Sequence, residues 1–188
     1  LRMGLELAWG ALKELIDTGL DDAQVDAIRK TLLATPGVRG LHELRTRRMA
    51  HQALVDAHVL VDARISVSEG HRIAESARAG VLREHHDVLD VLVHIDPEDD
   101  LDPDLAAAGL PSREALLEEL ADLLVSLPTP EHVVLHYLGG RVEVEVFLAH
   151  DVFADISALR STEAALAERI KDHPAIRSIS LNFRIAPE

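Results

Sequence analysis

Apolar residues along this chain follow two spacings, one typical of helices and one typical of strands. Five stretches repeat an apolar residue every three or four positions, as on one face of an amphipathic helix: 3–16, 22–35, 66–84, 112–126 and 155–172. Six others have apolar runs or alternation, as in strands: 38–48, 52–62, 88–95, 131–138, 141–149 and 176–185. The pattern predicts a fold that mixes helices and strands.

After the first helix, the order helix–strand–strand–helix–strand occurs twice. The copies are separated by PEDDLDPDLAAAGLP (97–111), whose prolines and acids are typical of a linker. We expect an α+β fold of two tandem ferredoxin-like (αββαβ) units, each a three-stranded mixed sheet with helices on one face, preceded by an N-terminal helix. The expected domains are 1–19, a first unit at 20–97, a linker at 98–111 and a second unit at 112–188.

Local signals support these boundaries. Asp21 or Asp22 can cap the helix that follows, because a carboxylate accepts hydrogen bonds from the free N–H groups of the first turn. The pair Gly139 and Gly140 separates two strands and predicts a tight hairpin turn.

Composition excludes several functional classes. The formal net charge is −14, which argues against binding nucleic acid or an anionic membrane surface, since both require clustered Lys and Arg. No run of about 18 apolar residues occurs, so we expect no transmembrane span in this chain. There is no cysteine, which excludes disulfides and thiolate metal sites and fits a cytoplasmic location. The 11 histidines are an unusual enrichment.

Two strands of the first copy carry metal-ligand residue types on their polar faces. His94 and Asp96 are two residues apart and share a face, while Val93 and Ile95 take the opposite one. In the strand at 52–62, His58 also points away from the apolar face. If the two strands are neighbours, His58, His94 and Asp96 converge.

Two more histidines extend this set. His71 lies about one turn into the helix at 66–84, and His42 lies in the strand at 38–48 or just before it. Four imidazoles and a carboxylate suit Zn²⁺, and also Fe²⁺, Co²⁺ or Mn²⁺. A carboxylate can bridge two cations, so a two-metal site is feasible. With no cysteine and no obvious nucleophile, we expect no catalytic residues and no enzymatic activity.

A simpler interpretation stays open on these residues alone. A single histidine on a strand is more often a surface or hydrogen-bonded side chain than a ligand. Two histidines and an aspartate on one sheet face make the metal site and this simpler interpretation about equally good. The acidic charge also has a plain explanation, because it keeps a protein soluble.

Four segments in this order resemble the cytoplasmic C-terminal domain of cation diffusion facilitator transporters, which are dimeric membrane proteins that export Zn²⁺ and related cations such as Cd²⁺. They are PGVRGLHELRTR (36–47), VDAHVLVD (55–62), SEGHRIAE (68–75) and VLVHIDP (91–97). The resemblance covers about residues 1–98. Within it, Glu43 stands where the family often has Asp.

The resemblance implies a ligand set and partners. In the family's zinc transporters, the matching residues bind a pair of zinc ions near the dimer interface; here they are His42, His58, His71, His94 and Asp96, with Asp96 as the bridge. It also implies a homodimer attached to the transporter's membrane domain, on the cytoplasmic side of the cell membrane. Residues 4–17 resemble the stretch that leaves the last transmembrane helix, which favours that interpretation over a packed terminal helix.

The second copy departs from the ligand pattern. Aligned by sequence, it has Glu145 opposite His58, Arg160 opposite His71, Asn182 opposite His94 and Arg184 opposite Asp96. Because a cation beside two arginines is repelled, we expect this copy to keep the fold without the site. His132 and His136 share a strand face and offer at most a weak extra site.

These observations favour a metal-sensing dimerisation domain of a cation efflux transporter. Two alternatives are kept: a module that binds a small molecule between the copies, and a purely structural dimerisation domain whose histidines bind nothing. A hydrolytic two-metal enzyme is the least favoured, because no sequence feature marks an open coordination position.

Overall fold

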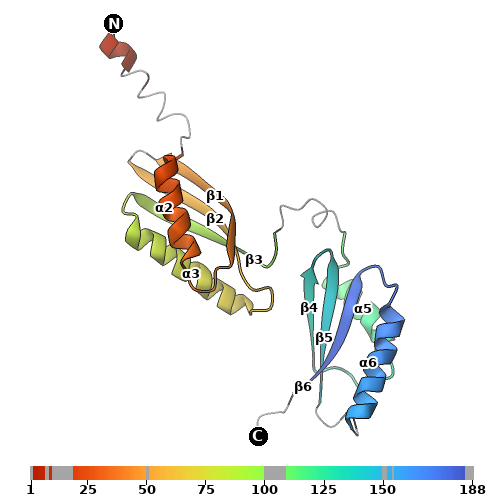
Figure 1. The fold of residues 1–188 in the computed structure, drawn as a ribbon. Coiled ribbons are helices and arrows are strands. Elements are labelled where there is room, and N and C mark those ends of the chain that lie inside the picture. The colour runs from red at the N-terminus through yellow and green to blue at the C-terminus, as the bar shows by residue number, and fades with distance from the viewer. Residues whose placement is uncertain are drawn as a thin grey trace. The chain divides into compact units, whose positions relative to one another are not determined.

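The computed structural model describes residues 2–6, 9, 19–49, 51–99, 109–149, 152–153 and 155–184. The chain divides into two compact units, Leu1–Asp99 and Asp100–Glu188, which are described separately (Figure 1). The predicted helix at 3–16 lies largely outside the described residues, although residues 2–6 and 9 are helical. The predicted linker lies largely outside them too.

Both units have the predicted order of elements. The first consists of α2 (Asp22–Leu33), β1 (Gly40–Met49), β2 (Gln52–Leu60), α3 (Val67–Glu84) and β3 (Val88–Asp96). The second consists of α5 (Arg113–Leu123), β4 (His132–Leu138), β5 (Arg141–Ala149), α6 (Ile156–Ile170) and β6 (Ile176–Arg184). The element ends lie within three residues of the predicted ones.

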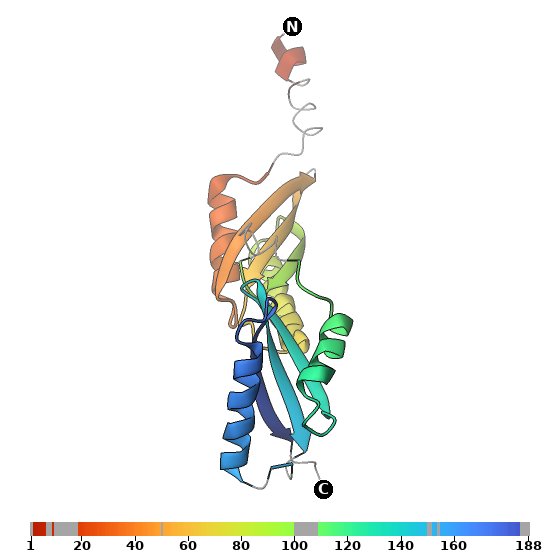
Figure 2. The same cartoon turned by 90° about the vertical axis from the view of Figure 1, so that its right-hand side faces the viewer.

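Each sheet is three-stranded and mixed. In the first, the strand order is β1-β2-β3, with β1 antiparallel and β3 parallel to the central β2. The second repeats this arrangement as β4-β5-β6, and its strands run side by side in both views (Figures 1 and 2). The α+β prediction of two αββαβ units with mixed sheets is confirmed.

The core of the first unit lies between its sheet and its helices. Asp21 caps α2 in a capping box with Gln24, and Ser66 caps α3, so both helices begin where their free N–H groups find acceptors. Helix α2 packs beside α3 (Figure 1). Buried residues come from one face of the sheet and from both helices: Ile28, Leu32, Ala53, Val55, Ala57, Ala77, Val81 and Val91. The helices therefore cover one sheet face, and we call the opposite face the outer face.

The second unit is built in the same way. One face of β5 supplies Val142, Val144, Val146 and Leu148, which pack with Leu116 and Leu120 of α5 and Leu166 and Ile170 of α6. At the β4–β5 turn, Gly139 and Gly140 have φ of 56° and 66°, the left-handed values that a tight hairpin requires. The predicted hairpin is therefore confirmed.

Candidate metal centre

Neighbouring strands bring His58 and His94 together on the outer face of the first sheet. The two residues are directly paired in the parallel register of β2 and β3, and their ring centroids are 4.7 Å apart. Ala57 and Val59, which flank His58 in β2, are buried, so the alternation of the strand directs His58 away from the core. Asp96 follows His94 by two residues and shares this face.

A β-bulge brings His42 to the same place. Leu41 pairs with Val59 and Glu43 with His58, so His42 is an extra residue in β1. Such a bulge bends a strand and redirects a side chain. The His42 Nε2 atom lies 2.8 Å from Oδ2 of Asp96, and the side chain is only 8% exposed.

Asp96 is the centre of this arrangement. With 4% of the whole residue exposed, it is the only polar or charged residue that is buried as a whole in the part of the chain that the structure describes. Its Oδ2 atom accepts from His42 Nε2 at 2.8 Å and from His58 Nδ1 at 3.1 Å. Its Oδ1 atom lies 3.1 Å from Nε2 of His94. The two carboxylate oxygens thus face different histidines, and we call His42, His58, His94 and Asp96 the His–Asp cluster.

Two further carboxylates surround the cluster. Asp99, three residues beyond Asp96, has its Oδ1 atom 2.9 Å from His42 Nδ1. Glu43, next to the bulge, has Oε2 3.6 Å from His58 Nε2 and Oε1 2.6 Å from Arg45. Neither was expected from the sequence to take part. The only sequence signals are that Glu43 adjoins His42 and that Asp99 lies in the acidic stretch after the strand.

The negative charge of the site acts on His42. Burial alone would lower the pKa of its imidazole, but hydrogen bonds to Asp96 and Asp99 and the charges of these carboxylates outweigh burial and raise it. A positive charge is therefore electrostatically favoured between these side chains.

His71 is not part of the cluster within this chain. It lies in α3 with an exposed side chain, whereas the cluster lies on the sheet face opposite the helices. His42, His58 and Asp96 can each supply a donor atom within 4.8 Å of the other two, and His94 joins them through Asp96. Four of the five expected residues therefore converge.

The donor atoms fit a first-row divalent ion. Imidazole nitrogens and a carboxylate are common ligands of Zn²⁺ and also suit Fe²⁺, Co²⁺ and Mn²⁺. His42 and His58 would hold an ion together with Oδ2 of Asp96. His94 would hold an ion at Oδ1, on the other side of the same carboxylate.

The second unit provides an internal comparison. In both central strands the register shifts at the same place, between Ala53 and Leu54 and between Val142 and Glu143, so the sheets can be aligned residue by residue. By this alignment Phe147 corresponds to His58, whereas the sequence alignment had placed Glu145 there. That alignment was wrong by two residues because strand alternation gives no unique register.

The other ligand positions in the second unit also differ. Asn182 corresponds to His94, as expected, and His132 corresponds to Glu43. The His132 ring contacts Phe147, with centroids 5.9 Å apart. Among the described residues, the second unit contains no group of three His, Cys, Asp or Glu side chains close enough to share an ion.

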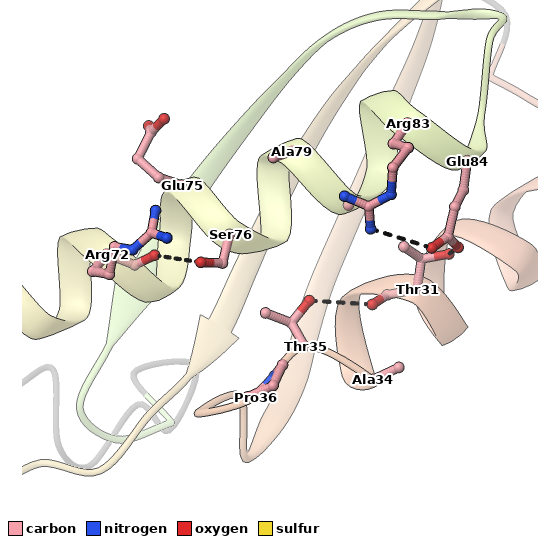
Figure 3. Close-up of a pocket in the computed structure, with 11 residues that line it drawn as sticks. Thr31, Ala34, Thr35, Pro36, Arg72, Glu75, Ser76, Ala79, Arg83 and Glu84 are labelled. Atoms are coloured by element: carbon pink, nitrogen blue, oxygen red, sulfur yellow. Dashed lines mark hydrogen bonds and ion pairs between the residues drawn. The ribbon is translucent and has the colours of Figure 1, made fainter.

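A pocket of about 410 Å³ lies between α2 and α3, on the helical side of the first unit (Figure 3). Its charged side chains are two arginines and two glutamates, namely Arg72, Glu75, Arg83 and Glu84. Glu84 accepts a hydrogen bond from Thr31 and lies 3.6 Å from Arg83. Because the charges balance, the pocket offers no net attraction to an ionic ligand, and the His–Asp cluster is the stronger candidate site.

Comparison with known proteins finds relatives of the unit that carries the site. The family model described as "Cation efflux protein, cytoplasmic domain" matches residues 20–98. Metal tolerance protein C1 of Arabidopsis thaliana is 37% identical over 94 residues, covering 50% of this chain and 20% of the relative. The cation-efflux pump FieF of Pectobacterium atrosepticum is 32% identical over 97 residues, covering 52% and 32%. The chain thus spans a third or less of the length of these relatives.

A solved structure, "MamM-CTD 215-293", is similar to part of this chain. The match covers 41% of this chain and 98% of the solved one, with 26% identity and a TM-score of 0.40.

Within the described part of the chain, no helix is both long and apolar enough to cross a bilayer. The family match coincides with the αββαβ unit that carries the His–Asp cluster. Residues 20–98 of this chain therefore match the cytoplasmic domain of cation efflux proteins.

Proposed function

We propose that the His–Asp cluster binds divalent metal ions, Zn²⁺ foremost, and that residues 20–98 form the regulatory and dimerisation domain of a cation efflux transporter. One observation carries the proposal: three imidazoles converge on the only buried carboxylate among the described residues. Burying a charged carboxylate is costly unless a partner compensates it. A divalent cation bound among these donors would compensate it well.

The internal comparison supports a site over a packing role. The second unit has the same sheet and the same register shift, yet places Phe147 and Asn182 where the first unit has His58 and His94. The fold therefore does not need these histidines.

Charge suggests how binding would regulate the transporter. Each chain carries a net charge of −14, so two copies repel each other. Metal binding reduces this repulsion. If the two copies can adopt two arrangements, the metal stabilises the one that binds it more tightly. The size of that effect is limited by the difference in metal affinity between the two arrangements. The attached membrane domain, on the other side of residues 1–19, would respond to that arrangement.

His71 enters the proposal through the dimer. It is exposed on α3 and does not join the cluster of its own chain. We include it as a ligand that one copy offers to the cluster of the other, which is how a five-residue set can be completed near a dimer interface.

Calorimetry with Zn²⁺ on the 188-residue chain tests the proposal. We expect binding that the His58→Ala, His94→Ala double variant abolishes. The matched control is His132→Ala with His136→Ala, which removes two histidines from the outer face of the second sheet and should leave binding intact. Sedimentation with and without the metal reports dimerisation. Absence of binding, or equal binding by the cluster variant, would disprove the metal site.

A further inference from the structure

The two histidines that face Oδ2 of Asp96 share a second feature. Each has its other ring nitrogen directed at a different carboxylate. For His42, Nε2 faces Asp96 and Nδ1 lies 2.9 Å from Asp99. For His58, Nδ1 faces Asp96 and Nε2 lies 3.6 Å from Glu43. The arrangement is therefore similar in both histidines, with the roles of the two ring nitrogens exchanged, although the Asp99 contact is a hydrogen bond and the Glu43 contact is a longer ion pair.

This arrangement has a known chemical consequence. A histidine binds a metal through one ring nitrogen, and the N–H of the other can donate to a carboxylate. That hydrogen bond selects which nitrogen carries the proton, fixes the ring plane and makes the ligating nitrogen more basic. A carboxylate in this position contributes to affinity without touching the ion.

We propose that Asp99 and Glu43 are positioning residues that present His42 through Nε2 and His58 through Nδ1 to the metal. The inference rests on the proposed function, because it assumes that these histidines are ligands. It adds two residues to the site that the five-residue set does not contain. It also specifies which nitrogen of each ring binds.

The two carboxylates differ in how they are held. The Oε1 atom of Glu43 lies 2.6 Å from Arg45, which leaves Oε2 turned toward His58, and the Glu43 side chain is 25% exposed. Asp99 is 59% exposed and lies beyond the end of β3, yet it contacts a histidine that is only 8% exposed. Asp99 is thus the more exposed of the two carboxylates.

Substitution of each carboxylate tests the inference. Zn²⁺ affinity of the full chain is measured for Asp99→Ala, Glu43→Ala and Asp56→Ala. The last is the matched control: it removes the same charge from the same sheet face, two residues before His58, and Asp56 lies between Arg45 of β1 and Leu92 of β3, with no cluster histidine opposite it. We expect each of the first two to weaken Zn²⁺ binding about 10-fold to 100-fold, and the control to bind like the wild type. Asp99→Glu should restore much of the loss.

Imidazole nitrogen NMR separates positioning from a general loss of charge. In the Zn²⁺-loaded protein, His42 should carry its proton on Nδ1 and His58 on Nε2. Asp99→Ala should alter only the His42 signals and Glu43→Ala only those of His58. If the wild type binds Zn²⁺ and both variants bind as tightly as Asp56→Ala with unchanged ring signals, the inference is wrong while the proposed function stands.

The metal-free protein gives an independent outcome. A hydrogen bond from His42 Nδ1 to Asp99 should slow exchange of that ring proton with water, and Asp99→Ala should abolish the slow signal. If the wild type fails to bind Zn²⁺, the proposed function fails. In that case, a His42 signal that is the same in wild type and Asp99→Ala overturns the positioning role as well.

Discussion

At the scale of the residue, Asp96 explains why the cluster exists. It lies at the end of β3 and is 4% exposed, and among the described residues its side chain contacts three histidines and no lysine or arginine. Imidazoles, unlike lysine, can give up their protons to a metal near neutral pH. Asp96 is therefore a buried anion whose surroundings can exchange protons for a metal ion.

Asp96→Asn tests this role directly. The substitution keeps the shape but removes the charge and one acceptor, so we expect Zn²⁺ binding to fall below detection by calorimetry. In the metal-free protein, loss of the hydrogen bonds to His42 and His58 should destabilise the fold by about 1–3 kcal/mol, measured by urea unfolding with a chelator present. Wild-type affinity in this variant would contradict a bridging carboxylate.

The raised pKa of His42 predicts a pH dependence with a definite sign. Because the folded-state pKa lies above the ordinary value of 6.5, the protonated ring stabilises the metal-free fold fully below about pH 6.5. This stabilisation is lost as the pH rises through the raised pKa. A bound metal must displace that proton, so Zn²⁺ affinity should fall as the pH drops below the raised pKa.

Calorimetry in buffers of different ionisation enthalpy measures the proton released per ion. On binding Zn²⁺, His42→Ala should release fewer protons than the wild type. The control His132→Ala, in the second unit, should release the same number as the wild type. Equal proton release by wild type and His42→Ala would contradict the assignment.

At the scale of the element, the sequence predicted helices and strands well, because an element that is buried on one face has apolar residues at a regular spacing. The alternation of Val55, Ala57 and Val59 predicted which way His58 points, and the structure confirms that face. It did not reveal the bulge at His42, because an extra residue in one strand is visible only when both strands are paired. Asp99 was missed for a related reason: its contact crosses 57 positions of sequence.

The bulge itself leads to a prediction. Replacing His42 by Ala keeps the extra residue, whereas deleting His42 restores regular pairing between β1 and β2. We expect both variants to weaken Zn²⁺ binding, but only the deletion to remove the bulge, which changes the backbone at Leu41 and Glu43 while these residues stay opposite Val59 and His58. Amide chemical shifts of residues 39–43 report this difference. Identical spectra for the two variants would show that the bulge does not depend on the extra residue.

His71 belongs to a helix and not to the sheet, which gives it a distinct signature. If it completes the site across the dimer, His71→Ala should weaken Zn²⁺-dependent dimerisation in sedimentation experiments while one ion still binds to the monomer. The control is His51→Ala, an exposed histidine in the β1–β2 turn of the same unit. Loss of all Zn²⁺ binding in His71→Ala would instead place His71 in the cluster of its own chain.

At the scale of the whole molecule, the two units should respond differently to metal. Among the described residues only the first carries the His–Asp cluster, so on the proposed function we expect Zn²⁺ to stabilise that unit and not the second. At a free concentration of 100 times Kd, the gain for one site is about 2.7 kcal/mol. Amide hydrogen exchange measures this for each unit separately. With Zn²⁺, protection of the backbone amides from exchange should rise in β1 to β3 and stay constant in β4 to β6. Equal protection in both units would contradict the assignment of the site to one unit.

Asp99 has a consequence for the chain that follows it. It is the last residue of the first unit, and its carboxylate contacts His42. Any force or binding event that draws Asp99 away from His42 must break that contact, and on the proposed function would thereby lower metal affinity. Linkage makes the effect reciprocal, so an ion in the cluster would hold Asp99 in place by the same free energy. A hydrogen bond at the edge of the site would then connect metal occupancy to the position of the residue where the first unit ends.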